Sequence, residues 1–61
     1  MTTNELVNGK GRRVEVQFSN STMTGVLMGK QNSKAIVRFY VRLDGETRRS
    51  LVSARMITRF L

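Results

Sequence analysis

Short segments in which apolar and polar residues alternate constrain the fold of this chain more than any other feature. Residues 14–18 alternate strictly, residues 35–43 form the longest such run, and residues 57–61 alternate again at the end of the chain. A period of two is typical of strands that bury only one face. Together with residues 23–30, these segments predict strands. In the longest run the side chains divide into two faces: Ala35, Val37, Phe39, Val41 and Leu43 on one, and Ile36, Arg38, Tyr40 and Arg42 on the other.

Polar clusters and glycines predict where these strands turn or bend. Residues 19–21 and 31–34 are polar turn clusters. Gly25 and Gly29 interrupt the second strand, where glycine commonly marks a bulge or a sharp bend.

Residues 43–46, Leu-Asp-Gly-Glu, are the clearest hairpin signal in the chain. We favour a three-residue loop with Gly45 in the left-handed conformation over a two-residue loop, because it keeps more apolar residues together. This register pairs Val37 with Leu51 and Arg42 with Glu46.

The remaining segments complete the predicted fold. Residues 1–9 are interpreted as either a short helical turn or a flexible arm, and residues 52–56 fit a short tight turn better than a strand. Five short strands with one helical-type turn before the last describe an all-β fold, a small closed barrel. We therefore expect residues 10–61 to form a single barrel domain.

Net charge indicates the class of partner. Eleven Lys and Arg residues against four Asp and Glu give this chain of 61 residues a net charge of +7. In a domain this small the surplus charge must cover much of the surface, because little interior exists to hide it. Such a surface attracts polyanions, and nucleic acid is the most abundant polyanion in a cell. The composition points to DNA or RNA without distinguishing between them.

The same composition disfavours several other functions. The chain has no histidine and no cysteine, so it lacks the commonest general base, the commonest nucleophile and any ordinary set of zinc ligands. We expect no enzymatic activity, no metal and no cofactor. No apolar run approaches the roughly 20 residues that span a membrane, and the first residues do not resemble a secretory signal. A cytoplasmic location is the expectation.

Four stretches carry a resemblance to a known group of folds: residues 11–16, 24–29, 35–39 and 52–57. In their order and spacing they resemble the SH3-like small barrels, a group that includes KOW and Tudor domains, ribosomal-protein barrels and Sm proteins. The resemblance covers roughly residues 10–61 and implies a five-stranded barrel with a short 3₁₀ turn before the closing strand. It implies little about activity. The acidic and asparagine positions of the Sm turn fall at Gln31 and Ala35, so the base-binding turn of that family is not supported.

The outward stripe of residues 38, 40 and 42 carries the strongest candidates for binding. On a strand these positions lie about 7 Å apart, close to the spacing of an extended phosphate backbone. Arginine makes bidentate contacts with phosphate, and tyrosine offers a flat face to a base or sugar. The alternative is that the arginines only solvate an exposed sheet face while the tyrosine packs beneath a loop. Arg48 is expected opposite Tyr40 on the neighbouring strand. The predicted nucleic-acid-binding residues are Arg38, Tyr40, Arg42, Arg48 and Arg49, extended by Lys10, Arg12, Arg13, Lys30 and Lys34.

Two other functions stay open at this point. The first is a protein-interaction module, an inhibitor or regulator that binds an acidic protein surface, because basic charge serves either partner. The second is a homo-oligomeric RNA-binding protein in the manner of Sm proteins and Hfq, which requires self-association.

Overall fold

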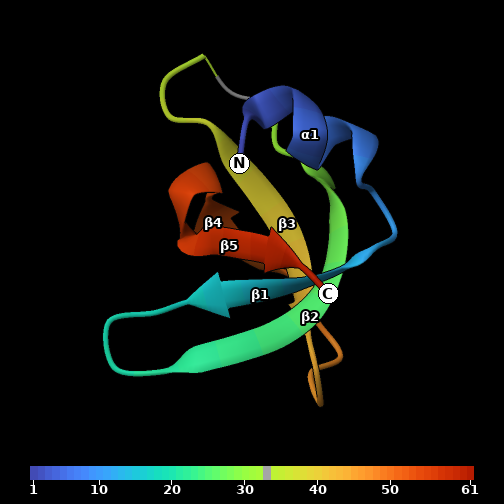
Figure 1. Cartoon of the computed structure of the whole chain (residues 1–61), viewed down its shortest axis with the longest axis vertical. Helices are drawn as coiled ribbons and strands as arrows, with labels where there is room; N and C mark the ends of the chain where they lie inside the picture. Colours follow the sequence, from blue (N-terminus) through green and yellow to red (C-terminus); the bar gives the residue numbers. More distant parts are fainter. Residues whose placement is uncertain (33) are drawn as a thin grey trace.

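Five antiparallel strands and one short helix make up the architecture. The computed structural model describes residues 1–32 and 34–61. The sheet has the strand order β4-β3-β2-β1-β5 (Figure 1). This arrangement confirms the all-β class, the five strands and the 3₁₀ turn before the last strand. In chain order the elements are α1 (Thr3–Asn8), β1 (Arg13–Gln17), β2 (Thr22–Lys30), β3 (Arg38–Leu43), β4 (Ser50–Ser53), the 3₁₀ turn η1 (Ala54–Met56) and β5 (Ile57–Phe60).

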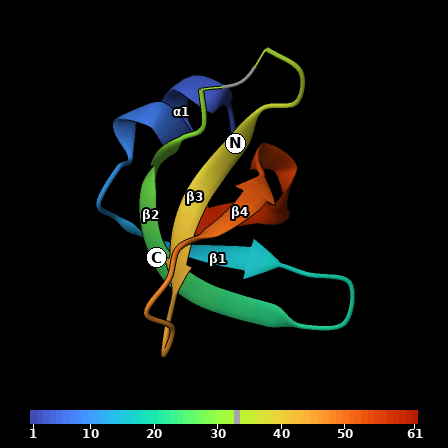
Figure 2. The same ribbon diagram turned by 180° about the vertical axis from the view of Figure 1, so that it is seen from behind.

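The long strand β2 joins the two halves of the sheet. Its first half pairs with β1 and its second half pairs with β3. Both views show β2 curving strongly along its length (Figures 1 and 2). The β2–β3 register shifts between Leu27 and Gly29, and Gly29 has a positive φ of 138°, so the predicted bend at this glycine is confirmed. Gly25 instead allows the backbone of β3 to approach β2 closely, because a Cβ at this position would lie 2.5 Å from the Arg42 carbonyl oxygen.

The core is built from the inward faces of every strand and from one helix residue. The alternation in residues 14–18 buries Val14 and Val16, and β3 buries Phe39, Val41 and Leu43, as the pattern predicts. Burying an apolar side chain of this size stabilises the fold by roughly 1.5–3 kcal/mol. The buried core residues are Leu6, Val14, Val16, Leu27, Phe39, Val41, Leu43, Val52 and Ile57.

Of the two interpretations of residues 1–9, the helix is the one found. Thr2 and Glu5 form a capping box: the Glu5 N–H donates to the Thr2 hydroxyl at 3.2 Å, and the Thr2 N–H donates to the Glu5 carboxylate at 3.0 Å. These bonds satisfy backbone donors that a helix start leaves unpaired. The hydrogen bonds that the Thr2 N–H and the Thr2 hydroxyl donate to the Glu5 carboxylate lower the pKa of Glu5. Leu6 is fully buried and anchors α1 to the core.

The third strand is shorter than predicted. β3 begins at Arg38 rather than at Ala35, and Ile36 and Val37 are 54% and 39% exposed. The neighbouring strands explain the difference, because β2 ends opposite Phe39 and β4 ends opposite Arg38. The ladders of β3 with both neighbouring strands therefore begin only at Arg38 and Phe39. The predicted polar turn at 31–34 includes Ser33, which lies outside the described residues.

The predicted register of the β3–β4 hairpin is wrong. Tyr40, not Val37, pairs with Leu51, and Val41 pairs with Ser50, so the connection spans residues 44–49. Gly45 has a positive φ of 84°, as expected. The longer loop lets β4 bury Val52 against the core, and β4 therefore includes residues 52 and 53, which the sequence assigned to the turn.

Candidate nucleic-acid interface

The outward side of β3 carries the residues that the sequence singled out. Arg38 and Tyr40 are half-buried and Arg42 is exposed, while the residues between them are buried. Alternation along a strand sends these three side chains to the same face. The predicted stripe is therefore present. We call Arg38, Tyr40, Arg42, Arg48 and Arg49 the basic face.

Arg49 covers the ring of Tyr40. Its guanidinium carbon lies 3.9 Å from the ring centroid, a cation–π arrangement. The sequence placed Arg48 opposite Tyr40, but Leu51 takes that position, because the loop is longer than predicted. Arg48 is exposed in the loop before Arg49. The flat surface that this stack offers a ligand is consequently a guanidinium plane resting on an aromatic ring.

Asp44 neutralises Arg13, which the sequence had assigned to the interface. The Arg13 guanidinium donates to both carboxylate oxygens of Asp44, at 3.0 and 2.6 Å. Thr24 also donates to this carboxylate. Hydrogen bonds from Arg13 and Thr24, with a smaller contribution from nearby Arg42, lower the pKa of Asp44 to about 2. Arg13 is exposed, but its charge is already balanced within the molecule.

Two of the other carboxylates, Glu15 and Glu5, also accept hydrogen bonds within the molecule. Glu15 accepts hydrogen bonds from Thr58 at 2.7 Å and from Arg59 at 3.1 Å on β5, and these contacts lower its pKa. Glu5 completes the helix cap. The fourth acid, Glu46, is exposed in the β3–β4 loop.

The basic face keeps its charge as a result. Within residues 1–32 and 34–61, the ion pairs join Arg13 to Asp44 and Arg59 to Glu15, and none involves an arginine of the basic face. The four arginines of the basic face lie on β3 and in the loop after it, and no carboxylate of the described residues is within ion-pair distance of them. The arginines of this chain are thus unequal. Arg13 and Arg59 are paired with carboxylates, whereas the arginines of the basic face form no ion pair among the described residues and are available to an external anion, although Arg42 is close enough to Asp44 to help lower its pKa.

The predicted cluster of residues 10, 12 and 13 does not act as one group. The Lys10 stem passes beside Gly29, where its Cδ and Cε would lie 3.8 Å from a Cβ. Gly29 pairs in register with Tyr40, so the Lys10 stem lies beside the strand position opposite the basic face. Arg12 instead lies over the Phe60 ring, 4.1 Å from its centroid.

The two remaining predicted lysines are exposed at the end of β2 and beyond it. Lys30 pairs in register with buried Phe39, so it does not share the outward row of Arg38 and Tyr40. Lys34 lies in the bend that precedes β3. Both are accessible, and neither is brought into the basic face by the strand pairing.

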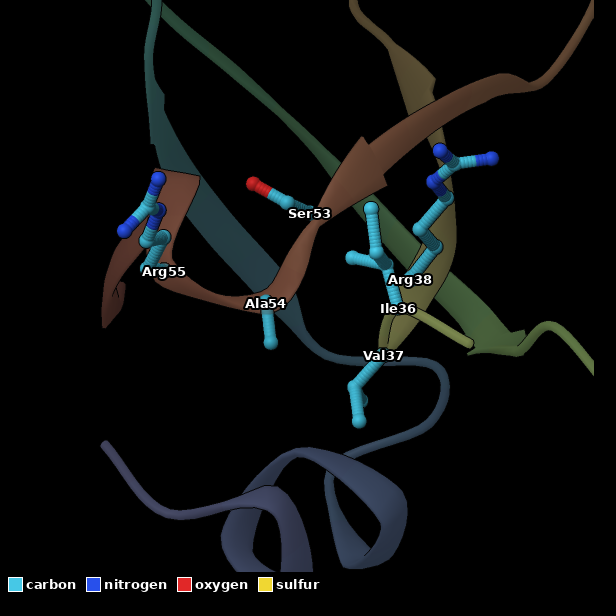
Figure 3. A pocket seen from close by; sticks show the side chains of 6 residues that line it. All are labelled: Ile36, Val37, Arg38, Ser53, Ala54 and Arg55. Carbon is cyan, nitrogen blue, oxygen red and sulfur yellow. The ribbon is translucent and has the colours of Figure 1, made fainter. Parts of the chain in front are cut away.

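Sequence reasoning missed a pocket and two exposed apolar residues beside the basic face. Leu51 is 40% exposed opposite Tyr40, and Met28 is 38% exposed next to Gly29. A pocket lies nearby, between the start of β3 and the end of β4 (Figure 3). Ile36 and Val37 before β3 are apolar and exposed, and they line this pocket. The alternating sequence pattern placed residues 35–37 in the strand, so the pocket was not predicted from the sequence.

Comparison with protein families, with curated proteins and with solved structures found no match to this chain. No helix in the described part of the chain has the length and hydropathy needed to cross a membrane. The described residues also contain no cluster of three or more carboxylates that would hold a metal ion.

Proposed function

We propose that this protein binds nucleic acid through the basic face, mainly by contacts with the phosphate backbone and with weak sequence preference. The observation that carries the proposal is the set of four arginines on β3 and the β3–β4 loop that form no ion pair among the described residues. Guanidinium groups form bidentate hydrogen bonds with phosphate. The stacked Arg49 and Tyr40 add a flat surface on which a base or sugar can rest.

A salt titration tests this proposal. Four phosphate contacts predict that log affinity falls linearly with log salt, with a slope of about −2.8 for a single strand and about −3.6 for duplex DNA. Affinities for single- and double-stranded DNA and RNA are measured by fluorescence anisotropy across a range of salt. Binding that does not respond to salt, or no binding at all, contradicts the proposal.

A matched pair of variants sharpens the test. Arg42→Gln removes a cation from the basic face, and we expect the slope to become shallower by about 0.7 to 0.9. Arg59→Gln removes the same charge from β5, at the opposite edge of the sheet, where it is paired with Glu15. It should leave the slope unchanged. Equal effects of the two substitutions would mean that net charge alone, and not this face, drives binding.

A second candidate function is a module that binds an acidic protein surface. The exposed Leu51 beside the basic face favours it, because protein interfaces combine apolar contacts with a charged rim. Capture of partners from a nuclease-treated lysate separates the two functions. A protein that is retained after nuclease treatment and released by Leu51→Ser supports the protein partner; loss of all captured material on nuclease treatment supports nucleic acid.

A further inference from the structure

The pocket beside the basic face is open to solvent and has the size of a small-ligand site. It measures about 490 Å³, within the range of roughly 300–1,000 Å³ common for small-ligand sites. Two chain segments line the pocket, residues 36–38 and residues 53–55. They are joined by the pairing of Arg38 with Ser53 and by a hydrogen bond that the Ala54 N–H donates to the Val37 carbonyl at 3.1 Å. The lining residues are Ile36, Val37, Arg38, Ser53, Ala54 and Arg55 (Figure 3).

The lining is apolar in the middle and cationic at its ends. Figure 3 shows Arg38 and Arg55 at opposite sides of the pocket, with the small and apolar side chains between them. Neither arginine forms an ion pair with any carboxylate that the structure describes. Ser53 adds a hydroxyl to the lining. Such a site suits a ligand that has an apolar or flat central part and negative charge on both sides.

One nucleotide within a strand has this distribution of charge. Its base is flat and largely apolar on both faces, and a phosphate lies on either side of its sugar. Arg38 belongs both to the pocket and to the basic face, so a strand following β3 leads directly to the pocket. A base in a duplex is stacked and paired, whereas a base in a single strand is free to enter a side pocket.

We propose that the pocket holds one unpaired base of a single nucleic-acid strand bound along the basic face, with Arg38 and Arg55 contacting the flanking phosphates. This inference rests on the proposed function and narrows it, because it names single-stranded nucleic acid as the ligand. It also adds Arg55 to the residues that bind.

A walk of abasic sites along a short labelled single strand tests the pocket directly. Removing a base leaves the phosphates in place, so the salt slope should stay the same at every position. At the position held by the pocket, loss of the base should weaken binding by about tenfold, because the base would lose its contacts with the apolar part of the lining. The matched duplex should bind more weakly than the single strand.

Two variants connect that sensitive position to the pocket. Ile36→Ser should weaken binding of the intact strand and leave binding of the abasic strand unchanged. Val7→Ser is its control, because Val7 on α1 is similarly exposed, 47% against 54%. Arg55→Gln should make the salt slope shallower by about 0.7. Circular dichroism spectra and melting curves confirm that each variant is folded.

The outcomes separate the pocket from the proposed function. A steep salt slope with a flat abasic walk, or a preference for duplex, overturns the pocket and leaves the basic face standing. No binding to any nucleic acid overturns both. If Ile36→Ser instead converts an associated species into a monomer without affecting strand binding, the pocket is an interface between copies of this chain and the inference is wrong.

Discussion

Substitution of Leu6 by alanine is expected to destabilise the protein strongly, although this residue lies on a helix of only six residues. Leu6 is fully buried and belongs to the same core cluster as Phe39 and Val41. Val7, the next residue, is 47% exposed. The two positions therefore give a matched comparison on one helix, with the same cap and the same chain length.

The size of the effect follows from burial. Replacing a fully buried leucine by alanine costs about 3–5 kcal/mol, because the lost contacts leave a cavity that closes only in part. Domains of this length have a total stability of roughly 3–9 kcal/mol, at about 0.05–0.15 kcal/mol per residue. Leu6→Ala should therefore remove from about a third to all of the free energy of unfolding. The corresponding fall in Tm is roughly 20 °C or greater.

Thermal and urea unfolding followed by far-UV circular dichroism measure this effect. Val7→Ala should change the free energy of unfolding by no more than about 0.5 kcal/mol, as is usual at exposed sites. If Leu6→Ala and Val7→Ala are equally mild, α1 does not pack on the sheet, and the core assigned to this protein is wrong.

Three further predictions concern the β3–β4 hairpin. The pKa of Asp44 is lowered to about 2 from 3.8, so the stability that its ionised form contributes is complete above pH 3.8 and is lost as pH falls through about 2. Asp44→Asn, which disrupts the pair with Arg13, should therefore reduce the fall in the urea midpoint between pH 3.8 and about pH 2. Gly45→Ala should destabilise by about 1–2 kcal/mol in thermal melts, because φ is positive there although nothing crowds the position. A double-mutant cycle of Tyr40→Leu and Arg49→Gln should give a coupling of about 0.5–1 kcal/mol in urea unfolding, and a coupling near zero would contradict the stack.

Much of the fold is readable from local pattern. The alternation of residues 14–18 and 39–43 fixes which side chains are buried, because a strand places successive residues on opposite faces. The turn at Gly45 and the bend at Gly29 follow from the freedom of glycine to adopt a positive φ. The resemblance to SH3-like barrels stays a prediction.

The predictions from the sequence failed where contacts between residues far apart in the chain determine the structure. The hairpin register depends on Val52 reaching the core, and the start of β3 depends on where β2 and β4 end. The last strand is a further case: Ile57 is buried and Phe60 packs against the core, although a regular strand would point them to opposite faces. The irregular pairing of β1 and β5 between Glu15 and Val16 accompanies this arrangement.

For the candidate site too, some features could be predicted from local sequence and others depend on the tertiary structure. Sequence alone determined that cations greatly outnumber acids and that Arg38, Tyr40 and Arg42 share one face, because composition and strand period are local properties. Only the tertiary structure decided which cations are free. Asp44 meets Arg13 across 31 positions of sequence, and Glu15 meets Arg59 across 44. Ion pairing depends on distance in space, so the folding of the sheet determines which arginines the few carboxylates pair with and which arginines stay unpaired.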